Sequence, residues 1–167
     1  MKIIQLFAFV ILLVSSCKQE QKTSELILEN IEITLDGPLF EGSNTAQCLV
    51  ESPLDNFLVD NKFEKESLKE AILTELIIKT DDTSNFNLYQ SITIQFVSEN
   101  TEMVKVAVIN PVPQNTNTIT LKIAEEQKDI IELLKQEKIY IVADAILNSD
   151  SDMNVNLNCN LKFNIKH

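Results

Sequence analysis

Arginine and tryptophan are absent from this 167-residue chain, and glycine occurs only twice. All 14 basic residues are lysines; they stand against 25 acidic residues, so the net charge is -11. Phosphate contacts need positive charge and base recognition favours the guanidinium fork of arginine, so this composition argues against a nucleic-acid partner. Two glycines are also too few for a phosphate-cradling loop. The simplest role of the acidity is to keep the protein soluble.

Catalytic residue types are equally scarce. The single histidine is the last residue, His167, where order is not expected. No Ser-His-Asp or Cys-His arrangement can be built around it, and no Cys/His cluster has zinc spacing. Adjacent acids occur at Asp81-Asp82 and Glu125-Glu126, but nothing selects a pair facing each other across a cleft, as a glycosidase requires. We therefore expect no enzyme activity, no cofactor and no metal.

One short segment has the opening of a calcium-binding loop. Asp150 to Asn154, "DSDMN", follows the D-x-D-x-N pattern, but Val155 stands where the loop needs glycine. The chain then continues directly into an alternating apolar segment. Aspartate and asparagine in a hairpin turn explain the segment better than a calcium site does.

The N-terminus carries the most specific signal. Met1 and Lys2 precede an almost wholly apolar run, Ile3–Val14, which is followed by Ser15, Ser16 and Cys17. A charged start, a short apolar run and small residues are typical of a secretory signal peptide, and the run is too short to span a bilayer reliably. "VSSC" resembles the lipobox of bacterial lipoprotein precursors. This resemblance implies cleavage before Cys17 and attachment of acyl chains, such as palmitate, to that cysteine.

The residues after Cys17 bear on location. Lys18 follows the cysteine, which in the Gram-negative lipoproteins that this chain resembles implies transfer to the outer membrane. Glu20 is similar to the acidic surface-export signals of Bacteroidetes lipoproteins, but the membrane face stays open. We expect a signal peptide over 1–16, a lipidated cysteine and tether over 17–24, and one domain over 25–167. The protein would thus be held in the cell envelope by its lipid.

Most of the domain alternates between apolar and polar residues, the pattern of half-buried strands. We expect about eight antiparallel strands, one or two short helices and an all-β sandwich, Ig-like or related, with a closed barrel as the alternative. Glu29-Asn30 interrupts the first strand and indicates a bulge. Ser67–Glu70 has capping-box spacing and predicts a helix start. The expected strands are 27–35, 46–50, 72–79, 88–96, 104–108, 119–123, 139–145 and 153–166, and a helical turn is expected over 129–136.

The last strand, "MNVNLNCNLKFNIK", alternates almost without exception. Its odd positions are apolar, from Met153 to Ile165, and its even positions are asparagine or lysine. The apolar row predicts the wall of a core. The asparagine row is either a solvated surface or a face that binds a polyol or glycan by hydrogen bonds.

Cys48 and Cys159 are the two cysteines that remain beyond Cys17, and each stands in the apolar row of its strand. An exported protein meets an oxidising compartment, where such a pair often forms a disulfide. If the two strands face each other across the sandwich, a Cys48–Cys159 disulfide is expected. Two separate buried thiols are the alternative.

These observations favour a membrane-anchored, non-enzymatic binding or structural module that contacts protein or glycan. A sandwich edge or the proline-punctuated loop 110–118 could supply the contact surface. Two alternatives remain: a carrier of a lipid or other apolar ligand, and a hydrolase that acts on envelope polysaccharide through carboxylates.

Overall fold

The computed structural model describes residues 22–51, 53–80, 85–125, 127 and 129–167. Residues 1–16, where a signal peptide is expected, Cys17, the Asp81-Asp82 pair and Glu126 lie outside the described residues, so the expectations placed on them stay predictions.

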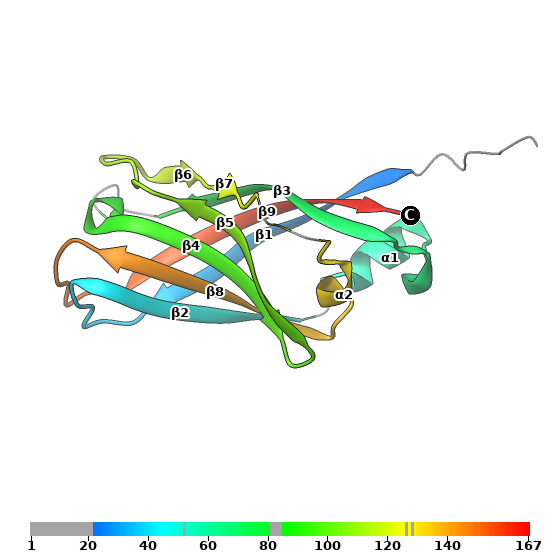
Figure 1. Ribbon diagram of the computed structural model, residues 1–167, viewed down its shortest axis with the longest axis horizontal. Helices are drawn as coiled ribbons and strands as arrows, with labels where there is room; N and C mark the ends of the chain where they lie inside the picture. The colour runs from blue at the N-terminus through cyan, green and yellow to red at the C-terminus, as the bar shows by residue number, and fades with distance from the viewer. Residues whose placement is uncertain (1–21, 52, 81–84, 126, 128) are drawn as a thin grey trace, which may run out of the picture.

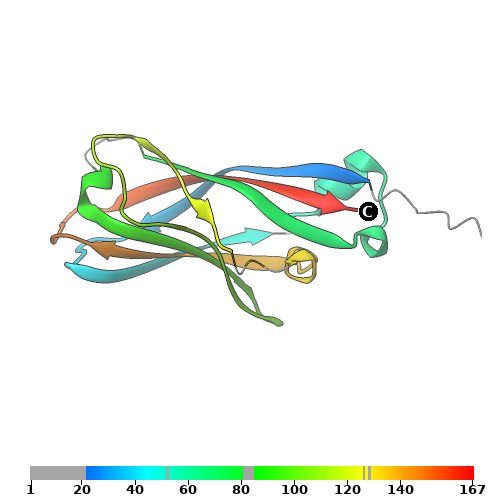
Figure 2. The same cartoon turned by 45° about the horizontal axis from the view of Figure 1, so that its top comes forward.

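The described chain forms two antiparallel sheets that pack face to face (Figures 1 and 2). The four-stranded sheet has the order β1 (Thr23–Leu35), β9 (Val155–Lys166), β3 (Glu70–Lys79) and β6 (Thr118–Thr120). The five-stranded sheet has the order β2 (Gly42–Glu51), β8 (Lys138–Leu147), β4 (Tyr89–Ser98), β5 (Thr101–Ile109) and β7 (Lys122–Ile123). The expected all-β sandwich is confirmed, and the strands form two separate sheets rather than a closed barrel.

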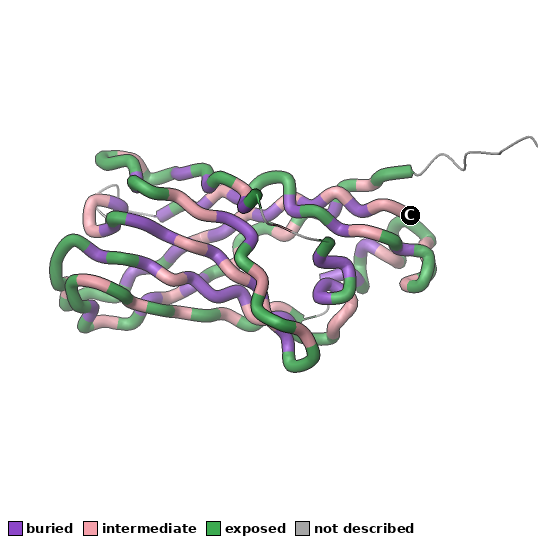
Figure 3. Tube along the Cα trace, viewed as in Figure 1, coloured by how far each residue is buried: buried purple, intermediate pink, exposed green. Residues whose placement is uncertain are grey.

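The core lies between the sheets and follows the alternation of the sequence. In β9 every second side chain from Val155 to Ile165 is buried, and the residues between them are not (Figure 3). Phe163 of β9 and Phe96 of β4 meet across the two sheets with ring centroids 6.2 Å apart. Burial of each large apolar side chain contributes about 1.5–3 kcal/mol, so this row is a main source of stability.

Met153 is an exception to that row. It was expected to extend the apolar face of the last strand, but β9 begins only at Val155 and the Met153 side chain is 74% exposed. It lies in the turn that joins β8 to β9, where the strand alternation does not yet hold.

The bulge predicted at Glu29-Asn30 is confirmed. The pairing of β1 with β9 shifts between Leu28, opposite Leu161, and Ile31, opposite Cys159. Two residues of β1 therefore stand opposite Asn160 alone. Asn30 has φ +58°, a left-handed conformation that asparagine tolerates better than most side chains do.

The segment expected to be one strand over 119–123 is divided between the sheets. β6 pairs with β3 in the four-stranded sheet, and β7 pairs with β5 in the five-stranded sheet. Leu121, buried between them, donates its backbone N–H to the carbonyl oxygen of Leu76 at 2.9 Å. The chain thus crosses from one sheet to the other at this residue.

The short helices differ from expectation. The prediction of a helix starting at Ser67–Glu70 is wrong, because Lys65–Ser67 is a single 3₁₀ turn and β3 begins at Glu70. The branched residues of 72–79 favour the strand instead. Two further short helices, α1 (Asp55–Asn61) and the 3₁₀ turn Asn85–Leu88, were not anticipated. The expected helical turn after 129 is present as α2 (Ile131–Leu134).

Both described chain ends lie at the same end of the sandwich, beside α1 (Figure 1). Thr23 pairs with Lys166, and β1 starts two residues before the expected domain boundary. His167, expected to lack order, is held there: its Nε2 lies 3.1 Å from Ser24 Oγ, and its ring centroid lies 4.0 Å from that of Phe63. No helix in the described part of the chain is long and apolar enough to cross a membrane.

The opposite end is closed by two loops that bind each other. Leu39 and Ser151 exchange backbone hydrogen bonds of 2.7 and 2.9 Å. A Cβ on Gly37 would lie 2.8 Å from the carbonyl oxygen of Asp152, so only glycine fits at that position.

Candidate functional site

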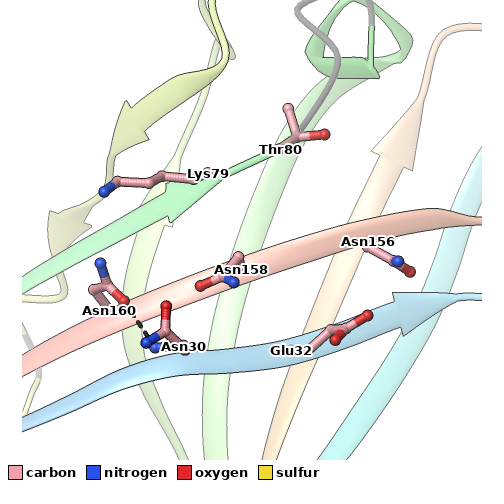
Figure 4. Close-up of a pocket in the computed structure, with 7 residues that line it drawn as sticks. All are labelled: Asn30, Glu32, Lys79, Thr80, Asn156, Asn158 and Asn160. Carbon is pink, nitrogen blue, oxygen red and sulfur yellow. Dashed lines mark hydrogen bonds between the residues drawn. The ribbon is translucent and has the colours of Figure 1, made fainter.

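The outer face of the four-stranded sheet carries a polar groove of about 240 Å³ (Figure 4). It crosses the three strands β1, β9 and β3, which are far apart in the sequence but adjacent in the sheet. The lining consists of Asn30, Glu32, Lys79, Thr80, Asn156, Asn158 and Asn160. We call this the asparagine groove; it coincides with the row of even positions that the sequence marked as a candidate glycan face.

Strand register places three groove residues in one line across the sheet. Asn158 stands opposite Glu32 of β1 on one side and opposite Lys79 of β3 on the other. Neighbouring strands lie about 4.8 Å apart, so the acid and the base are roughly 10 Å apart at their Cα atoms with an amide between them. A ligand lying across the groove would meet an acceptor, an amide and a cation in that order.

The other two asparagines of β9 that line the groove are oriented by strand β1. Asn160 Oδ1 accepts the backbone N–H of Asn30 at 3.0 Å, and Asn156 Oδ1 accepts the Thr34 hydroxyl at 3.1 Å. These bonds use one amide oxygen in each side chain and fix its orientation. Each amide nitrogen carries two N–H donors. Asn158 makes no side-chain hydrogen bond to another described residue, so its whole amide can bind a ligand.

This lining is suited to hydrogen bonding with a polar ligand. Amides donate and accept hydrogen bonds without changing protonation state, and hydroxyl groups of a polyol or glycan are complementary to both functions. The volume is below the 300–1,000 Å³ of ordinary small-molecule pockets, so the groove fits one small polar unit or one section of an extended polymer.

Lysines replace asparagines towards the far end of β9. Lys162 Nζ lies 2.9 Å from Glu25 Oε1 of β1, and Lys166 forms an ion pair with Glu70 of β3. The hydrogen bond that Lys162 donates to the Glu25 carboxylate raises the pKa of Lys162 above its ordinary value. These lysines pair with acids on the flanking strands and lie outside the groove lining.

A second hollow, of about 350 Å³, lies on the five-stranded sheet, where sequence reasoning had picked no residue. Its acid, Asp144, accepts hydrogen bonds from Thr45 Oγ1 at 2.6 Å and from Gln95 Nε2. Both carboxylate oxygens are thereby bound to side chains of the neighbouring strands. We therefore assign Asp144 to sheet stability.

The two cysteines of the domain are free thiols in the structure. Cys48 is half buried on β2 and Cys159 is buried on β9, so they approach the core from opposite sheets. Burial raises the pKa of Cys48. The pKa of Cys159 is raised to about 12, mainly by burial and to a smaller extent by the charge of Cys48. The expected Cys48–Cys159 disulfide is not formed here, and its formation in an oxidising compartment stays a prediction.

The remaining candidates from the sequence are accounted for by local structure. Asp150 Oδ1 accepts the backbone N–H of Glu41 at 2.7 Å, and Asn154 Oδ1 accepts that of Gly37 at 2.8 Å. The D-x-D-x-N segment thus ties two loops together. Glu125 is exposed and pairs with Lys122, whose hydrogen bond lowers the Glu125 pKa. Within the described ranges no cluster of three His, Cys, Asp or Glu side chains could hold a metal ion.

The space between the sheets bears on the carrier alternative. It is occupied by one continuous cluster of buried apolar side chains contributed by both sheets and by α2. The apolar rows of the sequence are compatible with either a lined cavity or a filled core. In the structure the apolar side chains of these rows pack against one another as a core.

Sequence reasoning found the β9 asparagines but missed Asn30, Glu32, Lys79 and Thr80, which complete the groove. Their contribution depends on the order of β1, β9 and β3 in the sheet, which local alternation does not encode. The Glu29-Asn30 bulge was the one local signal near them. The chain matches no protein-family model and no curated protein.

Proposed function

We propose that this chain is a lipoprotein of the cell envelope whose sandwich is a non-enzymatic binding module. Cys17 would carry the lipid and fix the protein to a membrane, and the outer membrane is the favoured site. The observation that supports binding is the asparagine groove. Asn156 and Asn160 are held in fixed orientation by β1, and Asn158 stands between Glu32 and Lys79.

The ligand class that best suits the groove is a hydroxyl-rich molecule, such as a glycan section. Its hydroxyls would accept from the amide N–H groups and donate to the Asn158 oxygen and the Glu32 carboxylate. Such binding is weak per contact, because each hydrogen bond replaces one to water. An anchored protein compensates through its high local concentration at the surface that displays the glycan.

The position of the chain ends supports this arrangement. The chain enters the sandwich at Thr23, at the end that carries α1 (Figure 1), and the groove lies on the outer face of the four-stranded sheet. A tether ending at Thr23 would leave the full outer face of the four-stranded sheet accessible above the membrane.

Lipidation is tested by expressing the full chain in a Gram-negative host and measuring the mass of the membrane-fraction protein. We expect a mature chain beginning at Cys17 with added acyl mass, and loss of that mass in Cys17→Ser. Cys48→Ser is the matched control and keeps the lipid. Acyl-free protein of native sequence in the soluble fraction would refute the anchor.

Groove binding is tested by NMR on isotope-labelled chain 22–167, which contains both sheets and the core. Neutral oligosaccharides of several linkages are titrated while the side-chain amide signals are followed. We expect the Asn156, Asn158 and Asn160 amides to shift and Asn158→Ala to weaken the response. Asn164→Ala, on the same face but outside the groove, leaves the response unchanged. Equal loss in both variants would place binding elsewhere.

A further inference from the structure

The two sheets have four edge strands, β1, β6, β2 and β7, and three of them are protected against pairing with another chain. β6 has 3 residues and β7 has 2, so neither offers much backbone. β1 is long, but the Asn30 bulge interrupts its register, and it carries the exposed acids Glu25, Glu29 and Glu32. Short length, bulges and charge are the usual means by which proteins protect sheet edges.

β2 lacks all of these protections. Its 10 residues pair with β8 from Gly42 to Glu51 without a register shift. The strand contains no proline and no lysine, and Glu51, its last residue, is its only charge. In an antiparallel edge strand about half of the residues direct their N–H and C=O groups away from the sheet. Between Thr45 and Glu51 no other described backbone group binds to that outer edge.

The side chains along β2 also favour contact. Leu49 is 45% exposed on the outer face, beside Tyr140 of β8 in the strand register. Asn44 closes the beginning of the strand by donating to the Phe40 carbonyl at 2.7 Å. The open section therefore runs over the second part of β2, where every side chain before Glu51 is neutral.

We propose that β2 is a dimerisation edge, at which two copies of this chain pair antiparallel to form one continuous sheet. A second copy is the occupant that the charges favour. In a chain of net charge -11, the stretch Gly42–Val50 is uncharged, so two copies can approach here without direct repulsion. Antiparallel pairing also places the two Glu51 side chains at opposite ends of the interface.

The geometry is that of a two-fold isologous contact, in which the same strand serves both subunits. Main-chain hydrogen bonds supply the affinity, as in other cases of strand addition, and Leu49 adds apolar contact. The asparagine groove lies on the other sheet, so the dimer would display two grooves. This inference is independent of the proposed glycan binding.

Sedimentation of chain 22–167 at physiological salt, from micromolar to submillimolar concentration, tests the proposal. We expect the mass to rise from monomer to dimer with concentration. Gln47→Lys places a charge in the middle of the edge, next to its own copy across the two-fold axis, and weakens the dimer at least about tenfold. Thr120→Lys adds the same charge to the edge strand β6 and leaves the dimer unchanged.

Hydrogen exchange at low and high protein concentration provides the second measurement. We expect amides of 45–51 to exchange more slowly at high concentration, while those of β1 and β6 do not change. A monomer at every concentration, a dimer insensitive to Gln47→Lys, or concentration-dependent protection on other strands only would each overturn the proposal. In a chain beginning at Cys17, concentration-independent protection of the β2 amides that point away from β8 would also overturn it and assign the edge to the chain's own N-terminal segment.

Discussion

The backbone N–H of Asn30 donates a hydrogen bond to Oδ1 of Asn160 at 3.0 Å, which fixes the bulge of β1 against the central strand β9. Asn30 has φ +58°, so its conformation favours asparagine, whereas the bond uses only its backbone N–H. One contact thereby connects backbone strain to the lining of the asparagine groove.

Asn30→Ala should lower the free energy of unfolding by about 1 kcal/mol, because alanine resists the left-handed conformation. Asn30→Gly should cost only a few tenths, since glycine adopts positive φ without steric penalty. Urea unfolding of the two variants measures the difference. Equal losses in both would show that the Asn30 side chain, and not its backbone conformation, is what matters.

Phe163→Ala should destabilise the domain by about 3–5 kcal/mol, because it removes a fully buried ring and leaves a cavity against Phe96. The adjacent Asn164 faces the opposite side of β9, so Asn164→Ala should change stability by less than about 0.5 kcal/mol. Denaturant midpoints of the two variants provide the comparison. A small effect of Phe163→Ala would mean that the two sheets are not packed through this ring pair.

Gly37→Ala should destabilise the loop end of the sandwich by about 1–3 kcal/mol, because the new Cβ would meet the Asp152 carbonyl at 2.8 Å. The atoms that the new Cβ would meet belong to the backbone of Asp152 and Met153 and not to a flexible side chain, so the backbone must move. Ser43→Ala, at an exposed position nearby, is the control and should be almost neutral. Thermal unfolding distinguishes the two, and an unchanged melting temperature for Gly37→Ala would contradict the close loop contact.

The thiols should differ in reactivity. In the folded, reduced domain iodoacetamide should modify Cys48 before Cys159, because Cys48 is only half buried and Cys159 has a pKa of about 12. Peptide mass spectrometry at successive times measures the order.

The Cys48–Cys159 disulfide is tested by a separate experiment, which counts free thiols after denaturing protein purified from an oxidising compartment. A count of two would exclude the disulfide, and a count of none would demonstrate it.

Alkaline pH should destabilise the reduced domain through Cys159. The unfolded thiol releases its proton near the ordinary value of 9.0, whereas the folded thiol keeps it to about 12. The unfolded state therefore binds fewer protons above pH 9, and stability falls by up to about 1.4 kcal/mol per pH unit from this group. Below pH 9 the effect is absent. Urea unfolding measures the free energy of unfolding against pH for the native sequence and for Cys159→Ala, and the difference between the two profiles is the contribution of Cys159. Identical profiles would refute this contribution.

Local alternation was sufficient to predict most strands, because a half-buried sheet imposes a period of two on residues such as Val155–Ile165. It was also sufficient for the bulge, since Glu29-Asn30 breaks that period. It failed where a residue is governed by distant contacts. Leu121 changes sheets within an unbroken alternation, and Met153 follows the pattern but lies in a turn.

The helices were harder to predict for a related reason. In α1 only Phe57 is buried, and no side chain caps its first turn, so neither periodicity nor capping marks its position. At Ser67 a capping-box pattern was present, but the strand that pairs with β9 begins at Glu70. The asparagine groove needs the order of three strands, and that order is a property of the whole fold.

The position of β9 in the four-stranded sheet has a consequence for synthesis. Among the described strands only β9 links β1 to β3, and its pairing with β1 joins residues more than a hundred positions apart. Contacts of such long range form slowly. Because β9 pairs with both β1 and β3, this sheet stays incomplete until β9 has been synthesised, although β3 can pair with β6 before then.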